Sequence, residues 1–326
     1  MKKTALILIS SLLCSALILG GCQMGGEPQA GQSESDISSG SGLPAYTYTY
    51  NPYALPSLAE ERLGRSLSVY KAAVDAVEER AETVSVGSEE EFELVKGLLE
   101  DYYPPFALVT DAQYSAADSS AKFTYRYNDR VHEQKMATYP QLLEGILKLA
   151  LKEGDSDTTK AMALYLYATS SMFESGRSGL TAWDALNGES DHNGYAEALG
   201  ALLLQAGVDC LEAEIEMGDG TPHLMVLVKL NGQYYYLDPY GEKELSDGTG
   251  LAAFGMTQKD CVEYGYLDAF AVKLGNGSGE VPPAAEDSRF SELRRCVRWE
   301  FDEKRENILA TVDGVQLDWG PLEKTG

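Results

Sequence analysis

The sequence predicts an α+β fold, in which a helix packs on an antiparallel sheet behind an N-terminal helical region. Residues 192–207, HNGYAEALGALLLQAG, carry apolar side chains at helical spacing. Residues 210–217, CLEAEIEM, alternate between apolar and acidic side chains, as in a half-buried strand. Two further strand-like segments, 223–230 and 233–241, flank Asn231-Gly232, a dipeptide that strongly favours a two-residue hairpin turn.

The N-terminus has the pattern of an export signal. Lys2 and Lys3 precede an apolar run over 5–19, which is shorter than the roughly 20 residues that a membrane span needs. The run ends in Leu-Gly-Gly-Cys, which resembles the bacterial lipobox and implies a lipid on Cys22. We therefore expect residues 1–21 to be a lipoprotein signal peptide and the protein to be extracytoplasmic, anchored to the bacterial membrane. The alternative is a plain secretory signal with a chance cysteine.

Residues 22–55 are predicted to form the lipidated cysteine and a flexible tether, because 23–43 are rich in Gly, Ser and Gln. Residues 56–150 are predicted to be a helical region with a small hairpin and no motif for chemistry. Ser88 and Pro104 are start and stop signals for one of its helices. The predicted elements are helices over 58–82, 88–104, 139–153 and 157–173, with a hairpin within 106–128.

The segment 190–207 predicts a helix that begins near Asp191, with Ser190 as its N-terminal cap and Gly207 as its left-handed C-terminal cap. Its predicted buried face consists of Tyr195, Leu199, Leu202, Leu203 and Ala206. In the strand that follows, Leu211, Ala213, Ile215 and Met217 are expected on the buried side, and Glu212, Glu214 and Glu216 on the other side.

The hairpin turn places a histidine beside a carboxylate. With Asn231-Gly232 as a two-residue loop, Asp238 faces Met225 across the two strands. His223 lies two residues from Met225 on the same face, so His223 and Asp238 are diagonal neighbours within reach of each other. A carboxylate that orients a histidine is half of a nucleophilic triad.

This combination resembles the transglutaminase-like domains of the papain-type superfamily, whose bacterial members commonly read G-x-x-x-C-x-G-Y-A-x-A-[LF], then H-A-W, then [VIL]-D-P-[TY]. The chain has GESDHNGYAEAL over 188–199, HLM over 223–225 and LDPY over 237–240. The resemblance covers 155–242, and it implies a transglutaminase-like domain with a C-terminal extension over 151–326. It implies triad positions at His192, His223 and Asp238.

The chain departs from this family at the nucleophile. His192 occupies the position of the catalytic cysteine, and Met225 replaces the usual tryptophan. An imidazole cannot form the family's thioester intermediate, so the cysteine mechanism is not available from these residues. Cys210 is expected at the far end of the helix, and nothing places Cys261 or Cys296 at the site. The cysteine spacing predicts no disulfide framework or zinc site, and we expect no cofactor and no metal.

The leading hypothesis is a catalytically inactive domain that binds a peptide, a protein or a cell-wall component at the cell surface. The alternative is a peptidase-like or amidase-like hydrolase that uses His192, His223 and Asp238, with or without a metal. A purely structural interpretation also stays open, in which His192 is solvated and His223 and Asp238 form a pair that stabilises the hairpin. The chain has 51 acidic and 26 basic residues, and this excess of negative charge argues against nucleic-acid binding.

Several packing details follow from the same patterns. Tyr234, Tyr235 and Tyr236 are expected to pack the hairpin rather than bind a ligand, with at least one of them exposed. Residues 250–272 are expected to complete the sheet, and 308–320 to form short strands. Residues 287–304 are predicted to be helical. If the fold is right, the start of the 192–207 helix faces the hairpin, and His192, His223 and Asp238 converge.

Overall fold

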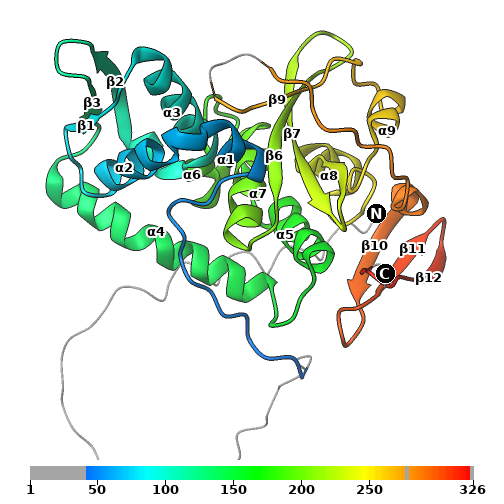
Figure 1. The fold of residues 1–326 in the computed structure, drawn as a ribbon. Coiled ribbons are helices and arrows are strands. Elements are labelled where there is room, and N and C mark those ends of the chain that lie inside the picture. Colours follow the sequence, from blue (N-terminus) through cyan, green and yellow to red (C-terminus); the bar gives the residue numbers. More distant parts are fainter. Residues whose placement is uncertain (1–41, 276–278, 324–326) are drawn as a thin grey trace, which may run out of the picture. The chain divides into compact units, whose positions relative to one another are not determined.

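The main sheet has four strands in the order β8-β7-β6-β9, and all neighbours in it are antiparallel. The computed structural model describes residues 42–275 and 279–323, and its mixture of helices and antiparallel sheets agrees with the predicted fold class. Figure 1 shows this sheet with α7 and α8 beside it. The strands are β6 (Cys210–Glu216), β7 (Pro222–Leu230), β8 (Gln233–Leu237) and β9 (Ala271–Val272).

The predicted hairpin register is confirmed. Leu230 pairs with Gln233, and Val226 pairs with Leu237, as a two-residue loop requires. Asn231 and Gly232 have φ angles of 51° and 77°. Two consecutive positive φ angles are those of a type I′ turn, whose twist matches that of the strands it joins. The turn therefore determines which side chains of β7 and β8 share a face.

The predicted signal peptide, the lipidated Cys22 and residues 23–41 of the predicted tether lie outside the described residues. Residues 46–53 of the predicted tether do pack against the protein: Tyr46, Tyr48, Tyr50 and Tyr53 lie against the hydrophobic core. The hydroxyl of Tyr48 donates to Gln205 at 2.7 Å, which fixes this segment to the end of α7. No helix in the described part of the chain is long and apolar enough to cross a bilayer.

Helix α7 (Gly194–Gln205) is the central helix of the fold. It packs against β6 and β7 and also contacts α5, α6 and α8. All the predicted core residues of this helix are buried, but so are the alanines at 196, 198 and 201. The helix is therefore enclosed on nearly all sides, which an amphipathic pattern with one apolar face does not anticipate. Gly207, with φ of 79°, follows its end as predicted.

The start of α7 differs from the predicted cap. The helix begins at Gly194 rather than near Asp191, and Ser190 does not cap it; its buried hydroxyl donates to the Asp191 carbonyl oxygen instead. The Asp191 carboxylate accepts the Gly194 N–H at 3.0 Å and, through its other oxygen, the Leu180 N–H at 3.1 Å. Ser190 also explains Gly194, because a Cβ there would lie 2.7 Å from the Ser190 Oγ.

The N-terminal region contains the predicted hairpin, but the helix predicted over 58–82 is divided into α1 and α2 by a 3₁₀ turn at 64–66. Ser88 caps α3 by accepting the Glu91 N–H at 3.2 Å. The helix predicted over 139–153 is wrong at its start. It begins ten residues earlier, at Asp129, with Asn128 as its cap, and it continues through Pro140. The elements are α1 (Ser57–Leu63), α2 (Leu67–Glu78), β1 (Thr83–Ser85), α3 (Glu89–Tyr102), β2 (Val109–Ser115), β3 (Ser120–Tyr125), α4 (Asp129–Ala150), α5 (Asp157–Ser171), β4 (Phe173–Glu174), α6 (Ala182–Leu186) and β5 (Glu189–Ser190).

The helix predicted over 287–304 is wrong. A short 3₁₀ turn (Ser291–Arg295) leads instead into a strand, β10, of a three-stranded antiparallel sheet in the order β10-β11-β12. The strands predicted over 308–320 are confirmed, and β9 joins the main sheet as expected. The remaining elements are α8 (Pro239–Ser246), α9 (Gln258–Glu263), β10 (Cys296–Phe301), β11 (Ile308–Val312) and β12 (Val315–Trp319).

Phe290, which precedes these C-terminal strands, packs against β8. The ring of Phe290 lies 4.9 Å from that of Tyr235 and 5.4 Å from that of Trp319, measured between centroids. Tyr235 and Tyr236 are both buried, and Tyr234 is half-buried, so the expectation that one of these tyrosines is exposed is wrong. The alternation of a strand places Tyr235 on the opposite face, but that face is not solvent here.

Candidate functional site

The hairpin brings His223 and Asp238 together as predicted. His223 is the second residue of β7, and Asp238 follows β8 and caps α8. The His223 Nε2 lies 3.1 Å from the Asp238 Oδ1, and both side chains are buried. The distance is that of an ion pair, although the ring N–H does not point along it closely enough for a well-formed hydrogen bond. This pair is the part of the predicted triad that stands in contact.

Two further donors hold the Asp238 carboxylate. The Gly241 N–H donates to Oδ1 at 2.8 Å, and the Tyr266 hydroxyl donates to Oδ2. Burial by itself would raise the pKa of Asp238, but His223 and these donors outweigh it and hold the pKa below its ordinary value. A Cβ on Gly241 would lie 2.3 Å from Oδ2. The carboxylate is therefore ionised at neutral pH and closely packed against the start of α8.

Two tyrosines complete the surroundings of His223. The ring of Tyr266 stacks on the imidazole with centroids 5.5 Å apart and planes 8° apart. The ring of Tyr240 lies 6.2 Å from the His223 ring. Tyr240 belongs to the LDPY motif, but Tyr266 comes from the segment after α9, and nothing in the sequence pattern points to it. Burial and the Asp238 charge raise the pKa of Tyr266, so it remains a hydrogen-bond donor.

His192 lies on the turn before α7 and is half-buried. Its imidazole makes no hydrogen bond to a described residue, but it packs edge-on against Tyr240 at 6.2 Å between ring centroids. Both histidines therefore contact the same tyrosine, and their rings can be no more than twice that distance apart. Tyr240 thus contacts both the helix start and the hairpin, and His192 makes no hydrogen bond to the His223–Asp238 pair.

Other groups that could supply chemistry are remote or protected. Cys210, Cys261 and Cys296 are free and buried, and burial raises the pKa of each thiol. The Asp238 charge adds to this effect at Cys261, so this thiol lies within the field of the site but is poorly ionised. The third histidine, His132, is on α4, and its Nε2 lies 2.6 Å from the Val77 carbonyl oxygen.

The three predicted positions do not form a metal site in the described part of the chain. No group of three or more His, Cys, Asp or Glu side chains there is arranged to hold a metal ion. Asp238 is surrounded by His223, Tyr266 and the Gly241 amide, and His192 is separated from it by Tyr240. The arrangement can hold one imidazole in a fixed orientation beside a carboxylate, which is what a general acid or base requires.

A second buried charge cluster joins β6 to the residue that follows β9. Glu212, expected on the exposed side of β6, is buried, and its Oε2 lies 3.1 Å from the Lys273 Nζ. Burial raises the pKa of Glu212, while Lys273 opposes the shift. The Asp101 Oδ1 lies 4.0 Å from the same ammonium. Lys273 lies 61 residues after Glu212 in the chain, and its ammonium group compensates the buried charge of Glu212.

Comparison with models of known protein families finds no match, and comparison with curated proteins finds no similar sequence. The resemblance to transglutaminase-like domains thus depends on the short motifs around His192, His223 and Asp238. These motifs lie on the start of α7, on β7 and at the junction of β8 with α8.

Proposed function

We propose that this chain is a lipid-anchored extracytoplasmic bacterial protein whose transglutaminase-like domain binds a ligand and has lost cysteine catalysis. The observation that supports this proposal most is the combination of a retained pair with a missing nucleophile. His223 and Asp238 are buried at 3.1 Å from each other, while an imidazole stands where the family has its thiol. The three described thiols are buried and have raised pKa values.

The order of elements is consistent with this proposal. A central helix precedes the hairpin in the chain, the histidine is on its first strand, and the aspartate directly follows its second strand. The ligand of such a domain is a peptide, a protein or a component of the cell wall. Lipid on Cys22 provides the link to the membrane, and the excess of acidic residues disfavours nucleic acid.

A hydrolase that uses His192, His223 and Asp238 is the second candidate. It is favoured by one observation: both imidazoles pack on Tyr240, and Asp238 orients one of them. In that case one imidazole would act as general base toward water, without a covalent intermediate. The metal-assisted version has less support, because the described side chains provide no three-ligand group.

The deciding experiment assays the purified mature protein with two probes, a peptide anilide for hydrolysis and a glutamine peptide plus a labelled amine for cross-linking. Wild type is compared with His192→Ala and His223→Ala, each before and after iodoacetamide treatment. We expect no turnover above background in any sample. Turnover that iodoacetamide abolishes would contradict the loss of cysteine catalysis. Turnover that resists iodoacetamide but disappears in both alanine variants would establish the hydrolase instead.

A further inference from the structure

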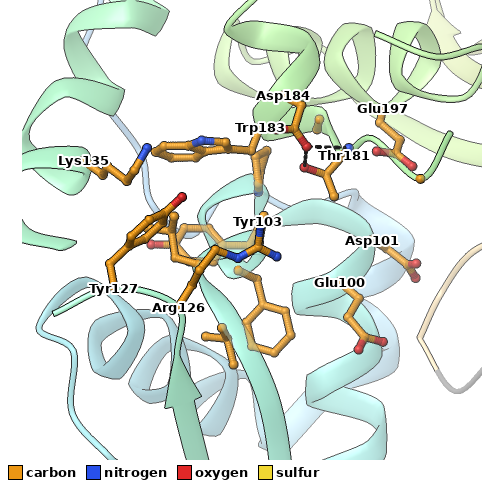
Figure 2. Close-up of a pocket in the computed structure, with 17 residues that line it drawn as sticks. Glu100, Asp101, Tyr103, Arg126, Tyr127, Lys135, Thr181, Trp183, Asp184 and Glu197 are labelled. Atoms are coloured by element: carbon orange, nitrogen blue, oxygen red, sulfur yellow. Dashed lines mark hydrogen bonds between the residues drawn. The ribbon is translucent and has the colours of Figure 1, made fainter. Parts of the chain in front are cut away.

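A cavity of about 430 Å³ lies apart from the histidine site, between the end of α3, the segment that joins β3 to α4, and α6. None of the three triad positions lines it. The volume falls in the range of small-molecule binding pockets. Figure 2 shows that its charged side chains divide by sign, with Lys135 and Arg126 toward one side and Glu100, Asp101 and Glu197 toward the other.

The cationic side combines two basic residues with aromatic rings. The Lys135 Nζ lies 5.0 Å from the ring centroid of Tyr127 and 5.6 Å from that of Trp183. Trp183 is fixed in turn by stacking on Tyr139, with centroids 5.2 Å apart. Within residues 42–275 and 279–323, no carboxylate pairs with the Arg126 guanidinium, which extends toward the middle of the cavity in Figure 2. Arg126 therefore presents its donors to the cavity.

Most acids on the opposite side already have partners within the protein. Asp101 accepts the Gly275 N–H at 3.2 Å and faces Lys273, and Glu100 lies 3.6 Å from the Lys96 Nζ. Asp184 accepts the Thr181 N–H and hydroxyl.

Glu197, on the first turn of α7, has no ion pair within 4 Å among the described residues. Burial raises the pKa of its carboxyl, although the nearby charge of Lys273 and a hydrogen bond from the Ala182 N–H work against this rise. Among the acids of this side, Glu197 is therefore the one without an ion-pair partner in the described part of the chain, and a cationic group that enters the cavity would supply one.

We propose that this cavity binds a short zwitterionic peptide, with its terminal carboxylate on Arg126 and Lys135, its amino group on Glu197, and its side chains against Trp183. The planar guanidinium is suited to two parallel hydrogen bonds with a carboxylate. The inference deepens the proposed binding function by naming a ligand class and a place, and it requires no activity at the histidine site.

The division of charge makes both ends of the ligand necessary. An anion without an amino group meets the acidic side of the cavity and the strongly acidic surface of the whole protein, whose formal charge is −25. A ligand with an amino group but no carboxylate leaves the charges of Arg126 and Lys135 without an anionic partner. A zwitterion satisfies both sides at once, so blocking either of its ends should weaken binding.

The test is calorimetric titration of the purified mature protein with trialanine, N-acetyl-trialanine and trialanine amide. We expect wild type to bind trialanine and to bind each blocked peptide about tenfold or more weakly, since a hydrogen bond to a charged group is worth at least that factor. Arg126→Gln should lose the preference for the free carboxylate, and Glu197→Gln the preference for the free amine. Arg130→Gln and Glu133→Gln, both exposed on α4 outside the cavity, are the matched controls.

Thermal unfolding of each variant shows whether it is folded. Absence of heat with millimolar trialanine in folded wild type would overturn the proposal, and so would binding that Arg126→Gln and Glu197→Gln leave unchanged. Either result would leave the loss of cysteine catalysis untouched, because that claim is decided by turnover and iodoacetamide. Conversely, turnover at the histidine site would not alter the expected preferences for the peptide ends.

Discussion

Replacing Asp238 with asparagine tests how much the His223–Asp238 pair contributes to the free energy of unfolding. Asp238 is fully buried and serves three partners at once: the His223 imidazole, the Tyr266 hydroxyl and the Gly241 N–H. Asparagine has the same shape and remains a good helix cap, so the bond to Gly241 survives. The change therefore removes the charge while it preserves the packing.

The expected loss follows from these contacts. Removing one member of a buried charge pair costs about 3–5 kcal/mol. Because the cap is retained, Asp238→Asn should lie at the low end, about 3 kcal/mol. Asp238→Ala should cost about 1 kcal/mol more, since it also removes the cap. Glu244→Gln, exposed on the same helix, should change the unfolding free energy by less than about 0.5 kcal/mol.

Urea unfolding at several pH values measures these differences. The folded-state pKa of Asp238 is depressed, so the ionised carboxylate stabilises the protein above its unfolded pKa, and this stability is lost as the pH falls through the folded value. The difference between wild type and Asp238→Asn should thus be full at pH 7 and shrink below about pH 4. A difference under about 0.5 kcal/mol at pH 7, or one that grows in acid, would refute this account.

Three further outcomes are expected. Lys273→Met leaves Glu212 and its neighbouring carboxylates without their cation, so urea unfolding should show a loss of about 3–5 kcal/mol at pH 8 and a smaller loss at pH 5.5, where protonation relieves the repulsion; an equal loss at both pH values would argue against it. His192→Cys should react with iodoacetamide at pH 7 faster than the same cysteine in a His223→Ala background, because a nearby imidazolium lowers a thiol pKa; equal rates would mean that the two positions do not communicate. Cys22→Ser should move the protein from the membrane fraction to the soluble fraction or leave it unprocessed, and unchanged membrane retention on immunoblots would oppose lipidation.

The parts of the fold that depend on local signals could be predicted from the sequence. Asn231-Gly232 determined the register of β7 and β8, and with it the contact between His223 and Asp238. Ser88 and Gly207 marked the start of one helix and the end of another. Each of these signals acts through a turn or a cap of a few residues, so no distant partner is needed to interpret it.

The errors arose where a distant segment decides the outcome. Glu212 lies on the polar side of an alternating strand, yet its side chain is buried in an ion pair with Lys273. Tyr235 lies on the opposite face of β8 from its two neighbours, yet Phe290 covers it. In the candidate site, Tyr266 reaches Asp238 from 28 residues away in a segment without a recognisable motif. Periodicity describes which face a residue is on, but only the tertiary structure determines what lies against that face.

The C-terminal strands have a consequence for how the protein is made. Phe290 packs on Tyr235 and Trp319, while Arg289 donates to the carbonyl oxygens of Pro321 and Leu322. During synthesis, β8 emerges from the ribosome well before these residues do, and it leaves an aromatic face uncovered in the meantime. The nascent chain thus passes through a stage in which an apolar face of the sheet is exposed. This face is buried only after the residues up to Leu322 have been synthesised. Stalled or truncated chains should therefore be prone to aggregation.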